Sequence, residues 1–124
     1  MYYCDANQVG GVFCPEFDIM EANQYSFHTT AHACDAPNSN GFYGNCDRGG
    51  SCTADVHNLG ANDYGPGSNY KIDSLKTIHV KIDFLEENGE FTGYTLTMSQ
   101  DGDELELSCH DKNDKNIAGM SVDF

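Results

Sequence analysis

The final third of the sequence constrains the fold most, because apolar and polar residues alternate there over a long stretch. In residues 77–84, Ile78, Val80, Ile82 and Phe84 alternate with polar residues, which is the period of a half-buried strand. The dipeptide Asn88-Gly89 follows and is a strong type I′ hairpin signal. Residues 91–98 form the returning strand, and Asp101-Gly102 turns the chain into a third strand at Leu105 and Leu107. The pattern predicts an antiparallel meander rather than a βαβ unit.

The remainder of the chain also favours β structure. Strand patterns cover residues 11–21 and 24–33, whereas residues 34–68 are rich in Gly, Asn and Asp and show little periodicity. Residues 110–124 are polar until Ile117 and end in Ser121-Val122-Asp123-Phe124, which is typical of the opening of a strand. We therefore predict an all-β protein.

Composition limits the partners. The 124 residues are enough for one domain at most, and their formal net charge is −14 with only six Lys and Arg residues. Such a chain repels phosphate backbones and anionic lipid, so we expect no nucleic acid and no membrane as a partner. Neutral polysaccharides are compatible with this charge. The sequence contains no apolar run of about 18 residues that would cross a bilayer.

The six cysteines indicate a disulfide-bonded protein from an oxidising compartment, and several pairings are open. The absence of a Cys-x-x-Cys motif and the scattered histidines argue against zinc. Residues 111–116 begin like an EF-hand loop but fail at its fifth and sixth positions. We expect neither a metal nor a cofactor. Residues 1–5 lack the basic and apolar regions of a signal peptide, so we expect a secreted protein whose beginning is missing from this chain.

Three carboxylates carry the best indication of chemistry. Glu16, Asp18 and Glu21 lie within six residues, in an apolar segment with Val12, Phe13, Phe17, Ile19 and Met20. Acids are costly to hold in a buried strand unless they are used. A retaining glycoside hydrolase needs one carboxylate to attack the sugar and another to donate a proton. The alternative is a solvated acidic edge, because the chain has 20 acids in all.

The spacing of the three acids leads to a structural prediction. In a regular strand Glu16 and Asp18 point to one face and Glu21 points to the other. A retaining mechanism requires its two carboxyls about 5–5.5 Å apart. A β-bulge at Ile19–Met20 would return all three acids to one face.

Five segments, in order along the chain, resemble glycoside hydrolase family 7, with most similarity to its protist branch. They are Tyr3-Cys4-Asp5-Ala6, Cys14-Pro15-Glu16-Phe17-Asp18-Ile19-Met20-Glu21-Ala22-Asn23, Thr30-Ala31-His32-Ala33-Cys34, Tyr64-Gly65-Pro66-Gly67 and Tyr70-Lys71-Ile72-Asp73. The resemblance spans nearly the whole chain. It implies an antiparallel β-jelly-roll sandwich that hydrolyses β-1,4-glucan with retention of configuration.

The resemblance also implies roles for individual residues. Glu16 would be the nucleophile, Glu21 the general acid/base, and Asp18 would hydrogen-bond the nucleophile. Asp5 would lie behind this cluster and His32 beside the cleft, although a histidine packed structurally against a disulfide is the alternative for His32. Tyr64 would line the groove, or simply belong to a tight turn.

Disulfides and loops follow from the same resemblance. The implied pairs are Cys4–Cys14, Cys34–Cys46 and Cys52–Cys109. Met20 stands where the family often has Trp, this chain has no Trp, and Asn58 replaces a common Arg. The short loops between paired cysteines favour endo-type cleavage in an open cleft. Family domains are several times larger, so we expect residues 1–124 to be the central part of one catalytic domain, monomeric and with little activity alone.

Two other functions remain open on the sequence. A family 16-like β-1,3(4)-glucanase carries a similar E-x-D-x-x-E strand, and activity on laminarin but not cellulose would favour it. A non-catalytic glycan-binding sandwich would bind oligosaccharide without needing Glu16 or Glu21.

Overall fold

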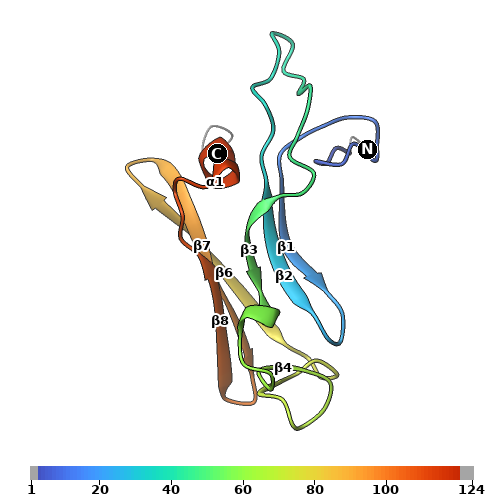
Figure 1. Ribbon diagram of the computed structural model, residues 1–124, viewed down its shortest axis with the longest axis vertical. Helices are drawn as coiled ribbons and strands as arrows, with labels where there is room; N and C mark the ends of the chain where they lie inside the picture. Colours follow the sequence, from blue (N-terminus) through green and yellow to red (C-terminus); the bar gives the residue numbers. More distant parts are fainter. Residues whose placement is uncertain (1–2, 121–124) are drawn as a thin grey trace.

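Two antiparallel sheets face each other in the computed structural model, which describes residues 3–120. One sheet has the order β1-β2-β3 and the other the order β6-β7-β8, with α1 at one end of the sandwich and β4 at the opposite end (Figure 1). The elements are β1 (Glu16–Ala22), β2 (Phe27–His32), β3 (Ser51–Asp55), the 3-10 turn η1 (Val56–Asn58), β4 (Tyr64–Gly65), β5 (Ile72–Asp73), β6 (His79–Glu87), β7 (Glu90–Gln100), β8 (Asp103–Cys109) and α1 (Lys115–Met120). The predicted all-β sandwich is confirmed.

The predicted meander is also confirmed. Strands β6, β7 and β8 pair antiparallel in sequence order. Asn88 and Gly89 both have positive φ, 57° and 85°, as a type I′ turn requires. Asp101 and Gly102 turn the chain in the same way, with φ of 53° and 97°. Local alternation and turn chemistry therefore determine this half of the molecule.

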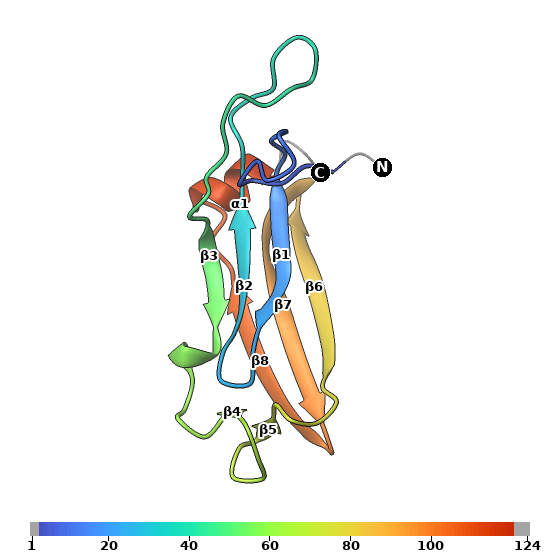
Figure 2. The same ribbon diagram turned by 90° about the vertical axis from the view of Figure 1, so that its right-hand side faces the viewer.

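The core lies between the two sheets. Apolar residues of β7 and β8 pack against apolar residues of β2 and β3. The first group is Leu96, Met98, Leu105 and Leu107, and the second includes Phe27 of β2. Burial of this surface drives folding. Figure 2 shows the two sheets one behind the other, with the loop of residues 34–46 extending beyond them.

Tyr94 joins the two sheets through its buried hydroxyl. This hydroxyl donates to the carbonyl of Cys52 at 2.7 Å or that of Thr29 at 3.1 Å, and it accepts from the backbone N–H of Ala54 at 3.0 Å. Burial raises the pKa of Tyr94 to about 12. Since it reaches both β2 and β3 from β7, Tyr94 fixes the separation and register of the layers.

Replacing Tyr94 by Phe should therefore lower the free energy of unfolding by about 2 kcal/mol, because the buried N–H of Ala54 loses its acceptor. Urea denaturation of the full-length protein measures this loss. The matched control is Tyr25→Phe, at a tyrosine that is 63% exposed. A Tyr94→Phe variant as stable as this control would contradict the expectation.

Three features differ from the sequence-based expectation. The expected buried strand around the acids is instead the outer strand of its sheet, and Ile19 and Met20 are 44% and 62% exposed. Strand β3 lies in the segment that showed little periodicity. Its pattern is weak because only Cys52 and Ala54 are buried there. Helix α1 was not expected either. The predicted strand opening at residues 121–124 lies outside the described residues.

Helix α1 begins at a side-chain cap and packs closely against β2 and the residue after it. The side chain of Asp114 accepts from the N–H groups of Asn116 and Ile117, which satisfies free donors of the first turn. Gly119 lies so close to Ala33 that a Cβ added there would be 2.6 Å from the Ala33 methyl. Within residues 3–120 no helix is long and apolar enough to cross a membrane.

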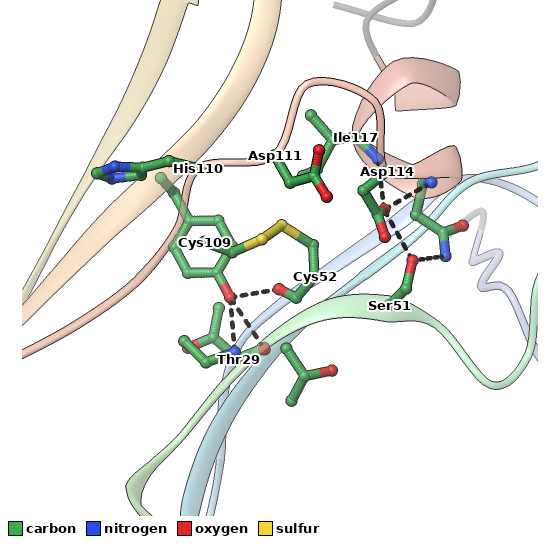
Figure 3. The surroundings of a disulfide bond; sticks show 12 residues. Thr29, Ser51, Cys52, Cys109, His110, Asp111, Asp114 and Ile117 are labelled. Atoms are coloured by element: carbon green, nitrogen blue, oxygen red, sulfur yellow. Dashed lines mark hydrogen bonds between the residues drawn. A yellow bond between two sulfur atoms is a disulfide. The ribbon is translucent and has the colours of Figure 1, made fainter. Parts of the chain in front are cut away.

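Three disulfides join the chain at Cys4–Cys14, Cys34–Cys46 and Cys52–Cys109. These are the pairs that the resemblance implied. The Cys52–Cys109 bond connects β3 to β8, and beside it Ser51 donates a hydrogen bond to Asp114 (Figure 3). The third disulfide thus ties the two sheets together at the end where α1 lies.

Candidate active site

The sheet β1-β2-β3 has one face toward the core and one toward solvent, and side-chain alternation separates them. Phe17, Ala31 and Ala54 belong to the core cluster. The opposite face carries a groove of about 380 Å³, which is lined by Asn7, Asp18, Glu21, His28, Thr30, His32, Arg48, Gly49, Thr53 and Asp55. The titratable side chains of these strands therefore gather on the outer face. A larger depression of about 780 Å³ lies at the β7–β8 turn and contains none of the three acids.

A β-bulge brings Asp18 and Glu21 into this groove. Glu16 pairs with His32 and Asp18 with Thr30, the register then shifts between Asp18 and Glu21, and Glu21 pairs with His28. This confirms the predicted bulge. Glu21 is an odd number of residues from Asp18, so in a regular strand it would point toward the core. The bulge therefore allows Asp18 and Glu21 to line the same groove.

Glu16 lies on the same strand face, two residues before Asp18. The backbone N–H of Ala6 donates to Glu16 Oε2 at 2.9 Å. The pKa of Tyr3 is raised, first by its hydrogen bond to Asp5 and by the charge of Asp5, and then by burial. The charges of Glu16 and Asp18 also raise it, because both acids lie near this hydroxyl. One oxygen of the Glu16 carboxylate is thus fixed by the N-terminal segment.

Asp5 holds that segment in shape. Its buried carboxylate accepts hydrogen bonds from the N–H groups of Asn7 and Val9. Burial pushes the pKa of Asp5 upward, but the hydrogen bonds from Val9, Asn7 and Tyr3 outweigh it and the pKa lies below its usual value. Asp5 thus orders the turn that carries the Ala6 donor, and its implied place behind the acids stays a prediction.

Asp18 contacts His32. His32 Nε2 lies 3.1 Å from Asp18 Oδ2, and His32 Nδ1 lies 2.8 Å from the carbonyl oxygen of Asp47. Since a carbonyl only accepts, Nδ1 carries a hydrogen and the ring orientation is fixed. His32 lines the groove. The implied hydrogen bond from Asp18 to Glu16 stays a prediction.

Asp47 in turn is held by α1. Lys115 Nζ lies 2.6 Å and Asn116 Nδ2 2.8 Å from Asp47 Oδ2. The hydrogen bonds from Lys115 and then Asn116 lower the pKa of Asp47 to about 2, although burial opposes them. Asn116 is 1% exposed and also binds Ser51 and the N–H of Ala33. The groove is therefore supported from the helix end of the sandwich.

Gly50 is required beside His32. Its φ is +64°, and a Cβ at this position would collide with Thr30 Cγ2 and lie 2.6 Å from His32 Cε1. Gly50→Ala should lower the free energy of unfolding by about 1–3 kcal/mol and displace His32. Gly41→Ala is the matched control, because Gly41 also has a positive φ, +80°, but nothing within 4 Å of an added Cβ. Equal losses in the two variants, measured by denaturation, would show that the collision is absent.

Glu21 contacts a residue that sequence analysis missed. His28 Nε2 lies 2.9 Å from Glu21 Oε2, and the two side chains are 35% and 49% exposed. The alternation of β2 was the available signal, since residues 28, 30 and 32 share one strand face. His28 therefore shares the groove face of β2 with His32.

Tyr64 does not line the groove. Its hydroxyl donates to the carbonyl of Asn23 at 2.9 Å, its ring packs edge-on against Phe27, and burial raises its pKa. These contacts attach β4 to the β1–β2 turn. Among residues 3–120, no group of three or more His, Cys, Asp or Glu side chains is arranged to hold a metal ion.

Comparisons with known proteins point to one family. Residues 4–121 match the family described as Glycosyl hydrolase family 7. Endoglucanase type C of Fusarium oxysporum is 30% identical over 141 residues, which cover 97% of this chain and 30% of that protein. Endoglucanase 1 of Humicola insolens is 31% identical over 129 residues, covering 84% of this chain and 31% of the relative.

Solved structures give the same result. The native Humicola insolens endocellulase EGI superposes with a TM-score of 0.61 at 27% identity, over 76% of this chain and 26% of that one. A family 7 cellobiohydrolase of Daphnia pulex gives 0.64 at 27% identity, over 89% and 31%. These neighbours are β-jelly-roll sandwiches. The chain spans about 30% of the length of the relatives that it matches.

Proposed function

Because this chain belongs to glycosyl hydrolase family 7, we propose that the full-length protein hydrolyses the β-1,4-glucosidic bonds of cellulose with retention of configuration. The observation that carries the proposal is the bulge of β1, through which Asp18 and Glu21 line one groove while Glu16 stays on the same strand face. Flanking carboxylates are what a double displacement requires.

Each carboxylate has one role in the proposed mechanism. Glu16 attacks the anomeric carbon as the bond to the leaving oxygen breaks, and Glu21 gives that oxygen its proton. Water then attacks the glycosyl-enzyme, Glu21 takes the proton from the water, and Glu16 leaves as a carboxylate. The N–H of Ala6 supports the nucleophile by binding one oxygen of Glu16. The contact with His32 holds Asp18 beside it.

We propose endo-type cleavage as the mode of action. The loops closed by Cys4–Cys14 and Cys34–Cys46 have sequence separations of only 10 and 12 residues, so they contribute little roof over the groove. Two of the similar proteins are named endoglucanases. Secretion and a monomeric state belong to the same proposal, with three disulfides and the net charge of −14 in support.

The test is the stereochemistry and specificity of the full-length protein. Proton NMR during hydrolysis of cellooligosaccharides should show the β-anomer of the new reducing end first, followed by mutarotation. An initial α-anomer would contradict the double displacement. Hydrolysis of laminarin without hydrolysis of cellulose would contradict the proposed linkage, and rapid loss of viscosity in soluble cellulose is expected for endo action.

A further inference from the structure

His28 is the neighbour of Glu21 that the proposed mechanism does not use. The two residues are cross-strand partners in β1 and β2, and His28 Nε2 is 2.9 Å from Glu21 Oε2. This distance is that of a hydrogen bond. The Glu21 side chain has three rotatable bonds and is 49% exposed. A donor that holds one of its oxygens therefore fixes the orientation of the other.

A second carboxylate lies on the other side of His28. Asp55 of β3 is the cross-strand partner of His28 in the neighbouring pair of strands. Burial raises the pKa of Asp55, but hydrogen bonds from the backbone and ring of His57, with the charges of His57 and His28, outweigh it and leave this pKa below its usual value. His28 therefore stands between two acids, one on each neighbouring strand.

The remaining charged groups of the groove come from β1, β2 and the loop after residue 46. They are Asp18, His32 and Arg48. Asp18 faces His32 at 3.1 Å, so its charge is already opposed by a different imidazole. Asp55 is likewise opposed by His57 at 2.8 Å, so Glu21 is the acid that His28 contacts directly.

A purely structural role explains little of this arrangement. The His28 side chain is 35% exposed and does not belong to either core cluster. Its loss would leave no large cavity. What the His28 side chain does contact is an acid that lines the same groove.

We propose that His28 is a positioning residue for Glu21, which holds one carboxyl oxygen through Nε2 and so directs the other toward the leaving oxygen of the substrate. This inference rests on the proposed role of Glu21 as acid/base.

The consequence concerns the orientation of Glu21 in both steps of the reaction. Glu21 donates a proton to the leaving oxygen in the first step and takes one from water in the second, so a carboxyl held in one orientation serves both. Loss of the His28 contact should therefore lower kcat rather than weaken substrate binding.

The test compares His28→Asn and His28→Ala in the full-length protein. Asn keeps an N–H donor without a charge, whereas Ala removes both. In the Ala variant kcat should fall by about 10-fold with KM unchanged, and Asn should rescue this loss.

His79→Asn is the matched control, since His79 is an exposed histidine of β6 in the other sheet. Equal kcat values in the Ala and Asn variants would overturn the positioning effect. An active wild-type protein with unchanged variants refutes this inference alone, whereas an inactive wild-type protein refutes the proposed function and with it the inference.

Discussion

Replacing Glu16 by Gln is expected to abolish glucan hydrolysis, with a loss in kcat/KM of at least about 10³-fold. The amide cannot form the glycosyl ester, so the double displacement has no first step. Its carbonyl oxygen can still accept from the N–H of Ala6, which donates to Glu16 Oε2 at 2.9 Å, so the fold should be preserved. Initial rates on soluble cellulose, with thermal unfolding as a check on the fold, measure both effects.

Glu21→Gln separates the two carboxylate roles. This variant should lose activity on cellulose as strongly as Glu16→Gln, but it should still cleave a cellobioside with a 2,4-dinitrophenyl leaving group, which needs no proton. Glu16→Gln should cleave neither substrate. Glu106→Gln, at an exposed glutamate of β8, is the control. Near-normal turnover of cellulose by Glu16→Gln or Glu21→Gln would refute the assignment.

Removing the Cys52–Cys109 disulfide has the largest expected effect on stability. The bond closes a separation of 57 residues, so the Cys52→Ala, Cys109→Ala double variant should lose about 4 kcal/mol of unfolding free energy on the chain-entropy model. This loss is a large part of the total stability of a typical domain. Guanidinium denaturation of the oxidised full-length protein measures it.

The control is the Cys4→Ala, Cys14→Ala variant, whose bond closes only 10 residues. It should lose about 3 kcal/mol on the same model. A greater loss for this short loop than for Cys52–Cys109 would show that loop closure does not determine the contribution of these bonds.

Local patterns account for the features that sequence predicted well. The β6–β7–β8 meander follows from alternation and from two turns whose first residues tolerate positive φ. The bulge between Asp18 and Glu21 followed from the requirement that acids of one site share one face. Both arguments use the period of a strand and need no knowledge of distant contacts.

Distant contacts explain what was missed. Helix α1 has six residues with a glycine near its end, too few for a periodic signal, and it is held by Asp114 and by Asn116 binding Ala33, 83 positions away. The exposure of Ile19 and Met20 depends on β1 being an outer strand, which apolar composition does not show. His28 was recoverable from alternation, whereas the attachment of Tyr64 to Asn23 required the tertiary structure.

Asp47 couples the stability of helix α1 at acidic pH to the geometry of the groove. Its side chain binds Lys115 and Asn116 of α1, and its backbone carbonyl orients His32. Because its pKa is lowered to about 2 in the folded protein, its contribution is complete above the unfolded value near 3.8 and is lost as the pH falls toward 2. Acidification across that window releases α1 and the support of His32 together. Local unfolding of α1 would therefore remove the support of His32, which contacts Asp18 in the groove.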